Sequence, residues 1–411
     1  MTHGGQLIEG SARVGPDVMA QHRWRSREWA TVAALSVTET VSWGVLYYAF
    51  AVFQVPMQRE LGYSTAQLTG AFSAALLVSG IAGIAAGRYL DRNGPRALMT
   101  IGSIGGVVLV LMWSRVHSLE AFYALWLAIG LVMAAVLYET AFTVLAKSFA
   151  RADERRRAMT ALTLVAALAS FIFLPLSQAL IDAYGWRDAL VVLATILGAV
   201  TIPLHAGVLR SPTSGPGAAA TGDPPGSVDA RKALRSRQFW RLTVAFFLAS
   251  ITAIAMIVHA IPFLLHRGYS ATFAAFAVGL VGISQVPGRL LFAPMAARTS
   301  SAKATASTFA LIALGVAVIV SVDDAAAVLV GLVLLGMGNG MATLSRATGI
   351  ADLFGSGSYG TIAGVTAAMT TSAMAVGPFA AAVWAATVGY DALLWTLVLI
   401  AAIASLLAYR A

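Results

Sequence analysis

The chain has no cysteine and few charged residues, and both shortages restrict what it can be. Without cysteine, it can form no disulfide framework and no cysteine-based metal or redox site. Charged residues make up 11% of the chain and hydrophobic residues 59%, whereas soluble domains carry roughly 25% charged residues. A soluble fold of 411 residues cannot hide that much apolar surface, so we expect the chain to lie in a lipid bilayer.

The sequence also lacks the signatures of enzymes and of ATP-driven pumps. Its lysines are Lys147, Lys232 and Lys303, and none belongs to the glycine-rich pattern of a phosphate-binding loop. It contains no nucleophile elbow and no cluster with metal-ligand spacing. We therefore predict that the protein is not an enzyme, needs no cofactor and no metal, and is driven by gradients.

Twelve apolar segments of roughly spanning length follow one another along the chain. They cover residues 29–56, 67–88, 98–115, 120–147, 158–181, 188–209, 240–264, 272–296, 304–321, 326–346, 358–384 and 391–408. A helix satisfies its own backbone polar groups in lipid, so we expect each segment to cross as a helix. The polar and basic segment 1–28 does not resemble a signal peptide and is predicted to be a cytoplasmic tail.

Positive charge is distributed unequally between the two sides of this arrangement. Of the 27 lysines and arginines, 22 fall in segments that are cytoplasmic if the N-terminus is inside. The outer loops hold Arg59, Arg115, Arg187 and Arg267. The positive-inside rule therefore predicts that both termini are cytoplasmic. The same bias explains the net charge of +9 without nucleic-acid binding.

The two halves of the sequence resemble each other. LGYST at 61–65 and RGYSA at 267–271 are 206 residues apart, as are Gly130 and Gly336. A cytoplasmic linker at 210–239, rich in Pro, Gly and Ser at its start, separates the halves. We expect two pseudo-symmetric six-helix bundles, residues 29–209 and 240–411, around a site near the membrane midplane.

The loop after the second span, GRYLDRNGPRALM at 87–99, carries the most specific pattern. Gly87, Asp91, Arg92, Gly94 and Arg96 resemble the G-x-x-x-D-R-x-G-x-R loop of the major facilitator superfamily. Within that family, SWGVLYYAFAVFQVPMQRELGYSTAQLTGAFS and the DRNGPR variant look most like the monocarboxylate porter and oxalate/formate antiporter group. The resemblance implies the all-α major facilitator fold, in which two bundles rock about a central cavity to alternate access.

One arginine, Arg289, lies within the otherwise uncharged segment 271–297. It is nine residues from Arg298, which is about 13 Å along a helix. A lone cation at that depth costs at least ~2.5 kcal/mol, so a carboxylate, a water-filled cavity or an anionic substrate must offset it. In the monocarboxylate porters an arginine of the eighth helix meets the substrate carboxylate, and the resemblance gives Arg289 that role. A purely structural ion pair is the alternative.

Three further residues are predicted to orient the substrate beside Arg289. Gln285 stands where those porters carry an acid, Tyr48 offers a hydroxyl, and Asn339 offers an amide within the glycine-rich stretch GMGNGMA. Tyr48 and Asn339 have structural alternatives, as a packing ring and as a bond between helices. Because residues 358–384 contain no Lys or Arg, a single buried cation favours a monoanion over a dicarboxylate.

Glu39 in the first span, Glu139 in the fourth and His259 in the seventh are candidate proton carriers. For each, a hydrogen bond or pair at a helix contact is the structural alternative. Glu139 and Arg346 occupy nearly equivalent positions in the two halves, so they are predicted to form a cytoplasmic gate pair. The alternative is that Arg346 extends to the inner surface.

These features predict a secondary transporter that moves a small organic anion, a monocarboxylate, with proton coupling. We expect a monomer that crosses the cell membrane many times, in a bacterial inner membrane. Proton-coupled efflux of a drug or amphiphilic metabolite is the alternative, and it predicts that Arg289 pairs with an internal acid. A membrane sensor that transports nothing is a third possibility, although the chain offers no soluble output domain.

Overall fold

The computed structural model describes residues 16–209 and 228–411, which form helices and turns without a β-strand. The first half contains α1 (Pro16–Trp43), η1 (Gly44–Tyr48), α2 (Ala49–Leu61), α3 (Thr65–Asn93), α4 (Pro95–Trp113), α5 (Leu119–Val136), α6 (Tyr138–Ser148), α7 (Ala152–Ala166) and α8 (Leu168–Gly207). The second half contains α9 (Ala230–Leu234), α10 (Arg237–His266), α11 (Ala271–Arg298), α12 (Ser301–Ser321), α13 (Ala325–Phe354), α14 (Tyr359–Val388) and α15 (Tyr390–Tyr409). Most of the predicted linker lies outside the described residues.

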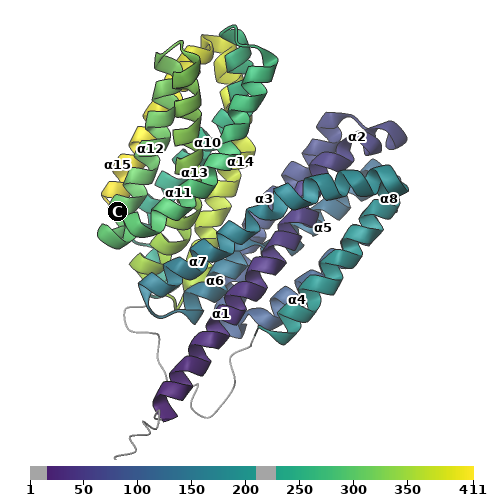
Figure 1. Cartoon of the computed structure of the whole chain (residues 1–411), viewed down its shortest axis with the longest axis vertical. Helices are drawn as coiled ribbons and strands as arrows, with labels where there is room; N and C mark the ends of the chain where they lie inside the picture. Colours follow the sequence, from purple (N-terminus) through teal and green to yellow (C-terminus); the bar gives the residue numbers. More distant parts are fainter. Residues whose placement is uncertain (1–15, 210–227) are drawn as a thin grey trace, which may run out of the picture.

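Ten described helical segments are long enough and apolar enough to cross a membrane. One of them, Ala152–Gly207, has 56 residues and joins α7 to α8, which turns back at Gly185 (φ 76°, ψ 163°; Figure 1). The first predicted span is not among the ten, because a π-helical turn, η1, divides it into α1 and α2. Helix α1 also begins at Pro16, inside the predicted tail 1–28. Twelve spans and cytoplasmic termini therefore stay predictions.

The repeated GYS sequences form the same turn in both halves. Gly62 and Gly268 have left-handed φ angles of 73° and 86°, a conformation that glycine adopts without steric cost. Two residues later, the hydroxyls of Ser64 and Ser270 accept hydrogen bonds from the third backbone N–H of the next helix. Each repeat therefore ends one helix and caps the start of another.

The repeated glycines make equivalent helix contacts. A Cβ on Gly130 would lie 3.0 Å from Cα of Ala75, and a Cβ on Gly336 would lie 2.9 Å from Cα of Val281. Both residues of the second pair lie 206 positions after those of the first. Only glycine allows this close backbone approach, so the same α3–α5 contact of the first half recurs between α11 and α13.

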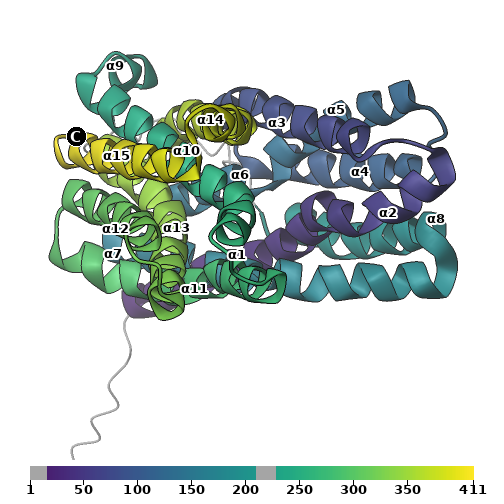
Figure 2. The same cartoon turned by 90° about the horizontal axis from the view of Figure 1, so that it is seen from above.

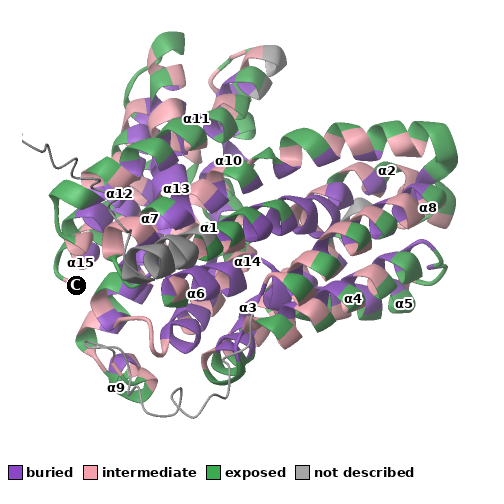
Figure 3. Cartoon of the chain, turned by 60° about the horizontal axis from the view of Figure 1, so that its bottom comes forward, coloured by how far each residue is buried: buried purple, intermediate pink, exposed green. Residues whose placement is uncertain are grey.

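The two bundles converge at one end of the molecule and diverge at the other (Figures 1 and 2). Helix α3 packs along α14, and α7 packs against α11 and α13, so these contacts join the halves. Buried residues face the helix contacts, whereas exposed residues cover the outside (Figure 3). That outside includes large apolar side chains such as Phe171 (79% exposed) and Phe379 (74% exposed), as expected for a surface that contacts lipid.

Candidate functional site

Arg289 on α11 is a buried guanidinium without a carboxylate partner among the described residues. The residue is 7% exposed. Its Nη1 donates to the backbone carbonyl of Thr163 on α7 over 2.7 Å, and its Nη2 reaches Oε1 of Gln285 over 3.4 Å. Its Nε is buried and has no hydrogen-bond partner in the part of the chain that the structure describes. The positive charge is therefore partly solvated by dipoles but is not neutralised.

The contact between α11 and α13 explains where Gln285 lies. A Cβ on Gly340 would lie 2.8 Å from Cα of Gln285, and one on Gly288 would lie 2.8 Å from Cα of Met337. These glycines let the two helices touch at the level of the predicted site. The contact between Gln285 and Arg289 therefore spans one turn of α11 that packs against α13.

Asn339 lies on a different face of α13 from this contact. It lines a cavity of about 190 Å³ between α10, α12, α13 and α14, together with Thr343 and Arg346. Its side-chain Oδ1 is buried and unpartnered within the described residues. Asn339 is thus available to a ligand, but Arg289 does not line the same cavity.

Tyr48 lies at the end of the π-helical turn η1, beside an aromatic cluster. A side chain on Gly44 would overlap the ring of Phe173, so this turn packs closely on α8. The rings of Tyr47 and Tyr48 lie 5.1 Å apart, and Trp43 lies 5.0 Å from Tyr138. π-Helical turns are frequent at functional sites because they change which side chains face inward.

The side chain of Arg289 is close enough to Tyr48 and Tyr138 for its charge to act on both hydroxyl groups. Tyr48 was predicted from the sequence as a substrate ligand. Tyr138 was not, although it precedes the predicted proton carrier Glu139 directly in LYETAF. Tyr138 joins the site because α5 ends at Val136 and a new helix, α6, starts at Tyr138.

Glu39 is fully buried on α1. Its Oε2 accepts a hydrogen bond of 3.0 Å from Nε1 of Trp43, and its Oε1 has no partner among the described residues. Glu139 and Tyr138 lie within electrostatic range of it. A buried carboxylate that is only partly hydrogen-bonded is costly when it is charged.

Glu139 and Arg346 form an ion pair of 2.6 Å between α6 and α13, hence between the two halves. The backbone at Leu137 is extended (φ −94°, ψ −174°), so Glu139 falls in the first turn of α6, where a helix favours negative charge. The side chain of Arg346 is 18% exposed. It therefore points to Glu139 instead of extending to the inner surface.

Asp91, from the sequence motif, joins the first half to the start of α14. Its carboxylate accepts hydrogen bonds from the backbone N–H of Gly360 (3.1 Å) and Thr361 (2.8 Å) and from the Thr361 hydroxyl (2.8 Å). It also pairs with Lys147 at 2.9 Å. Asp91 thus caps a helix of the other half, where free N–H groups and the helix dipole favour an anion.

The remaining motif residues shape this junction or lie on its surface. A side chain on Gly87 would overlap the backbone carbonyl of Gly360, so α3 and α14 meet only because glycine stands there. Gly94 has a φ of 77° and connects α3 to α4. Arg92 and Arg96 are exposed, as expected for anchors at a membrane surface.

A second inter-half pair was not predicted. Asp352 on α13 accepts from Arg155 at 2.5 Å and from Arg156 at 3.3 Å. The sequence analysis counted both arginines only toward the positive-inside bias. The available signal was Asp352 itself, an acid near the inner end of an otherwise acid-free span.

His259, the third predicted proton carrier, lies at a helix contact. It is 8% exposed, and its Nε2 is 3.1 Å from the carbonyl of Pro378 on α14. His205 on α8, which the sequence analysis did not select, makes a similar link to Ser103 on α4 at 2.7 Å. Both histidines have the geometry of the structural alternative, a hydrogen bond between helices.

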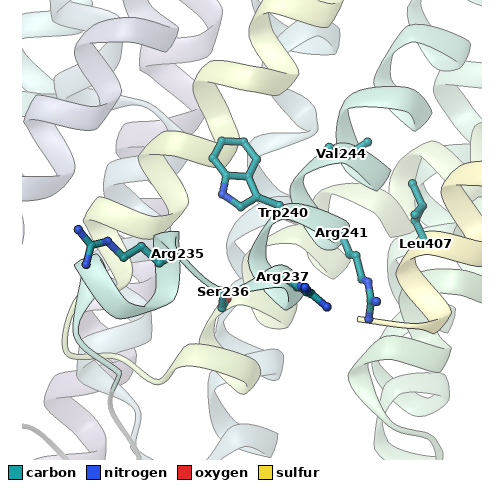
Figure 4. Close-up of a pocket in the computed structure, with 7 residues that line it drawn as sticks. All are labelled: Arg235, Ser236, Arg237, Trp240, Arg241, Val244 and Leu407. Atoms are coloured by element: carbon teal, nitrogen blue, oxygen red, sulfur yellow. The ribbon is translucent and has the colours of Figure 1, made fainter.

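A larger pocket, of about 370 Å³, lies away from these residues at the start of α10 (Figure 4). Its lining residues are Arg235, Ser236, Arg237, Trp240, Arg241, Val244 and Leu407. The three arginines and Trp240 are exposed. Basic and aromatic side chains of this kind are typical of the membrane interface.

Two membrane transporters have sequences similar to that of this chain. Bovine (Bos taurus) monocarboxylate transporter 13 is 29% identical over 272 residues, which are 64% of this chain and 60% of that protein. The oxalate:formate antiporter of Oxalobacter formigenes is 24% identical over 57% of this chain and 55% of that protein. The matched region thus spans less than two thirds of either relative.

Two solved structures have the same fold at low sequence identity. The human organic anion transporter MFSD10 superposes with a TM-score of 0.71 and 16% identity, over 93% of this chain and 99% of that one. FucP in its outward conformation gives 0.70 and 16% identity, over 92% and 98%. The profile of the Major Facilitator Superfamily matches residues 35–378. The chain therefore belongs to the major facilitator superfamily of membrane transporters and is not an enzyme.

Proposed function

We propose that this transporter carries a small organic anion, a monocarboxylate, whose carboxylate binds Arg289. The observation that carries the proposal is the state of that side chain: buried, charged and without a described carboxylate partner. A guanidinium offers paired donors to a carboxylate and keeps its charge at all physiological pH values. The substrate would supply the missing negative charge.

Neighbouring side chains would orient the anion. Gln285 already contacts Arg289, and the hydroxyls of Tyr48 and Tyr138 lie within its electrostatic range. Asn339, which lines a separate cavity within the second half, would contact the body of the substrate. The names of the sequence relatives, a monocarboxylate transporter and an oxalate:formate antiporter, support the same substrate class.

The efflux alternative predicted that Arg289 pairs with an internal acid. The described residues contain no ion pair of Arg289, which favours the anion proposal. Proton coupling would use Glu39, whose free Oε1 is buried, or Glu139, whose charge is balanced by Arg346. Protonation of either group as the anion binds would limit the charge that moves across the membrane.

The proposal includes twelve spans in a monomer with both ends cytoplasmic, as in a bacterial inner membrane. Two spans would come from Ala152–Gly207, since its 56 residues would reach about 84 Å as one straight helix, far beyond a bilayer of about 30 Å. The segment α1–η1–α2 would form one further span. Rocking of residues 29–209 against 240–408 would then expose Arg289 to each side in turn.

Thermal unfolding of the purified protein with small carboxylates, neutral metabolites and cationic drugs tests the proposal. A ligand that binds only the folded state raises the midpoint by mass action. We expect monocarboxylates to stabilise the wild type and to bind Arg289→Gln roughly thirtyfold more weakly, since a charged hydrogen bond contributes about 2 kcal/mol. Arg298→Gln, at the exposed end of the same helix, is the matched control and should bind normally. Equal carboxylate binding by Arg289→Gln and wild type would contradict the proposal.

A further inference from the structure

The pocket at the start of α10 gathers positive charge that no described acid neutralises. Five of the eleven residues 231–241 are lysine or arginine, and none is acidic. Arg235, Arg237 and Arg241 line the pocket, and none of them takes part in an ion pair of the described residues. A basic cluster of this size, directly before a membrane-spanning helix, attracts anionic lipids.

Two acceptors beside the basic residues already have other donors. The carboxylate of Asp229, the described acid closest to them in the sequence, accepts from the backbone N–H of Arg231 over 2.7 Å and so caps the short helix α9. The backbone oxygen of Ala411 accepts from the side-chain amide of Gln238 over 2.7 Å. The arginines of the pocket therefore keep donors for a ligand that carries negative charge.

Two of these arginines can act on one anion together. Arg237 and Arg241 are four residues apart on α10, so they share one face of the helix. In Figure 4 both extend toward the end of the chain, whereas Arg235 extends away from them. Nη1 of Arg241 donates to the backbone carbonyl of Arg410 over 3.0 Å, which holds this guanidinium beside the end of α15. Guanidinium groups bind phosphate oxygens with paired donors.

The pocket becomes apolar toward the membrane. Val244 lies three residues beyond Arg241, about 4.5 Å further along the helix, and Leu407 faces the same pocket from α15. Trp240, which is 45% exposed, donates through Nε1 to the carbonyl of Leu234 over 2.9 Å, and tryptophan favours the level of the lipid headgroups. Positive charge at the mouth and hydrocarbon behind it match the two parts of a phospholipid.

We propose that this pocket binds one phospholipid of net negative charge, with its phosphate between Arg237 and Arg241 and an acyl chain against Val244 and Leu407. A zwitterionic lipid offers the same phosphate but adds an ammonium group, which the surrounding arginines repel. A free phosphate lacks the chain that the apolar part would cover. The bound lipid joins α10 to α15, so it stabilises the second half, and it does so apart from Arg289 and the transported substrate.

Native mass spectrometry of the full chain in detergent, titrated with dioleoyl phosphatidylglycerol or dioleoyl phosphatidylcholine, tests this inference by counting bound lipids. We expect one phosphatidylglycerol to bind the wild type more tightly than phosphatidylcholine. The double variant Arg237→Gln, Arg241→Gln should bind it roughly thirtyfold more weakly, since each basic side chain contributes about fivefold at an anionic surface. The matched control Arg298→Gln, Lys303→Gln removes the same charge between α11 and α12 and should change the affinity less than twofold.

A single substitution and a competitor keep the result specific. Arg237→Gln changes one exposed side chain and should weaken phosphatidylglycerol about fivefold, so the test does not depend on the double variant. Inorganic phosphate should not displace the bound lipid. The inference is overturned if the wild type binds both lipids equally, if the two double variants lose the same affinity, or if inorganic phosphate displaces the lipid. Equal losses would mean that only general surface charge attracts it.

Discussion

The two ends of the bundle pair are held by polar contacts of different kinds. At the converging end, Asp91 caps α14, Asp352 pairs with Arg155, and Glu139 pairs with Arg346, and each contact crosses between the halves. At the other end, the described ion pairs stay within one half. Glu60 pairs with Arg187 in the first half, and Arg267 pairs with Asp323 and Asp391 in the second.

This difference indicates which contacts must break for transport. The outer clusters can travel with their bundles as rigid units, because neither one joins the halves. The inner contacts have to be lost and reformed in each cycle if the bundles rock. Substitutions at the inner end should therefore change conformation, whereas those at the outer end should change only local stability.

The largest effect is expected from Asp352→Asn. It leaves Arg155, whose side chain is 8% exposed, without its carboxylate, and breaking a buried pair costs about 3 kcal/mol. We expect the inner end to open roughly a hundredfold more often. Because the chain has no cysteine, a single Thr143→Cys reporter, which is buried near Gly360, can measure this opening by its labelling rate. Asp323→Asn, at the outer end, should leave that rate unchanged.

Asp91→Asn should open the same junction less often. The amide keeps the shape of the side chain but loses the charge-assisted bonds to the start of α14 and the pair with Lys147. At about 2 kcal/mol for hydrogen bonds to a charged group, the labelling rate should rise roughly thirtyfold. Asp153→Asn removes an exposed pair with Arg151 that stays within the first half and serves as the control. Equal rates for the two variants would show that the cap does not hold the halves together.

Gly87→Ala and Gly83→Ala form a matched pair on α3. A Cβ on Gly87 would overlap the backbone of Gly360, whereas one on Gly83 would meet nothing within 4 Å. Overpacking of this kind costs roughly 1–3 kcal/mol, so Gly87→Ala should reduce transport about tenfold and Gly83→Ala hardly at all. Substrate uptake in membrane vesicles, normalised to protein amount, provides the measurement. A similar loss for both alanine variants would mean that helix propensity, not contact, is responsible.

The smallest effect is expected from Glu60→Gln at the outer end. The hydrogen bond from the Trp186 indole, and then those from Arg187, hold the pKa of Glu60 below its usual value of 4.5. A lowered pKa stabilises the folded state above the usual pKa, and that stability is lost as the pH falls through the lower value. The thermal stability of the wild type should therefore decrease slightly below about pH 4.5. Glu60→Gln lacks this contribution at every pH, so its stability should not show the same decrease. Uptake at neutral pH should stay within twofold of wild type.

Residue patterns predicted the membrane location, the repeat and the burial of Arg289, because these depend on composition and on spacing along the chain. They also predicted that Glu139 and Arg346 form a pair. These residues occupy nearly equivalent positions in the two halves, and a repeat places such positions at the same level of the two bundles. They missed Tyr138, because the break at Leu137 that turns it inward has no strong local signal. They missed the link between Asp352 and Arg155, which are 197 residues apart.

The sequence by itself determined that this chain lies in a membrane, that its two halves are repeats of one unit, and that it buries an arginine where charge is costly. The length of the apolar segments and the unequal distribution of Lys and Arg decide these properties. They act through the free energy of transferring each side chain into lipid, which depends little on the residues packed around it. Only the tertiary structure decided which of these charges are neutralised: Arg346 meets Glu139, and Arg289 meets a carbonyl and an amide. That outcome depends on how the two bundles pack, because an ion pair requires two atoms to lie within a few ångströms of each other.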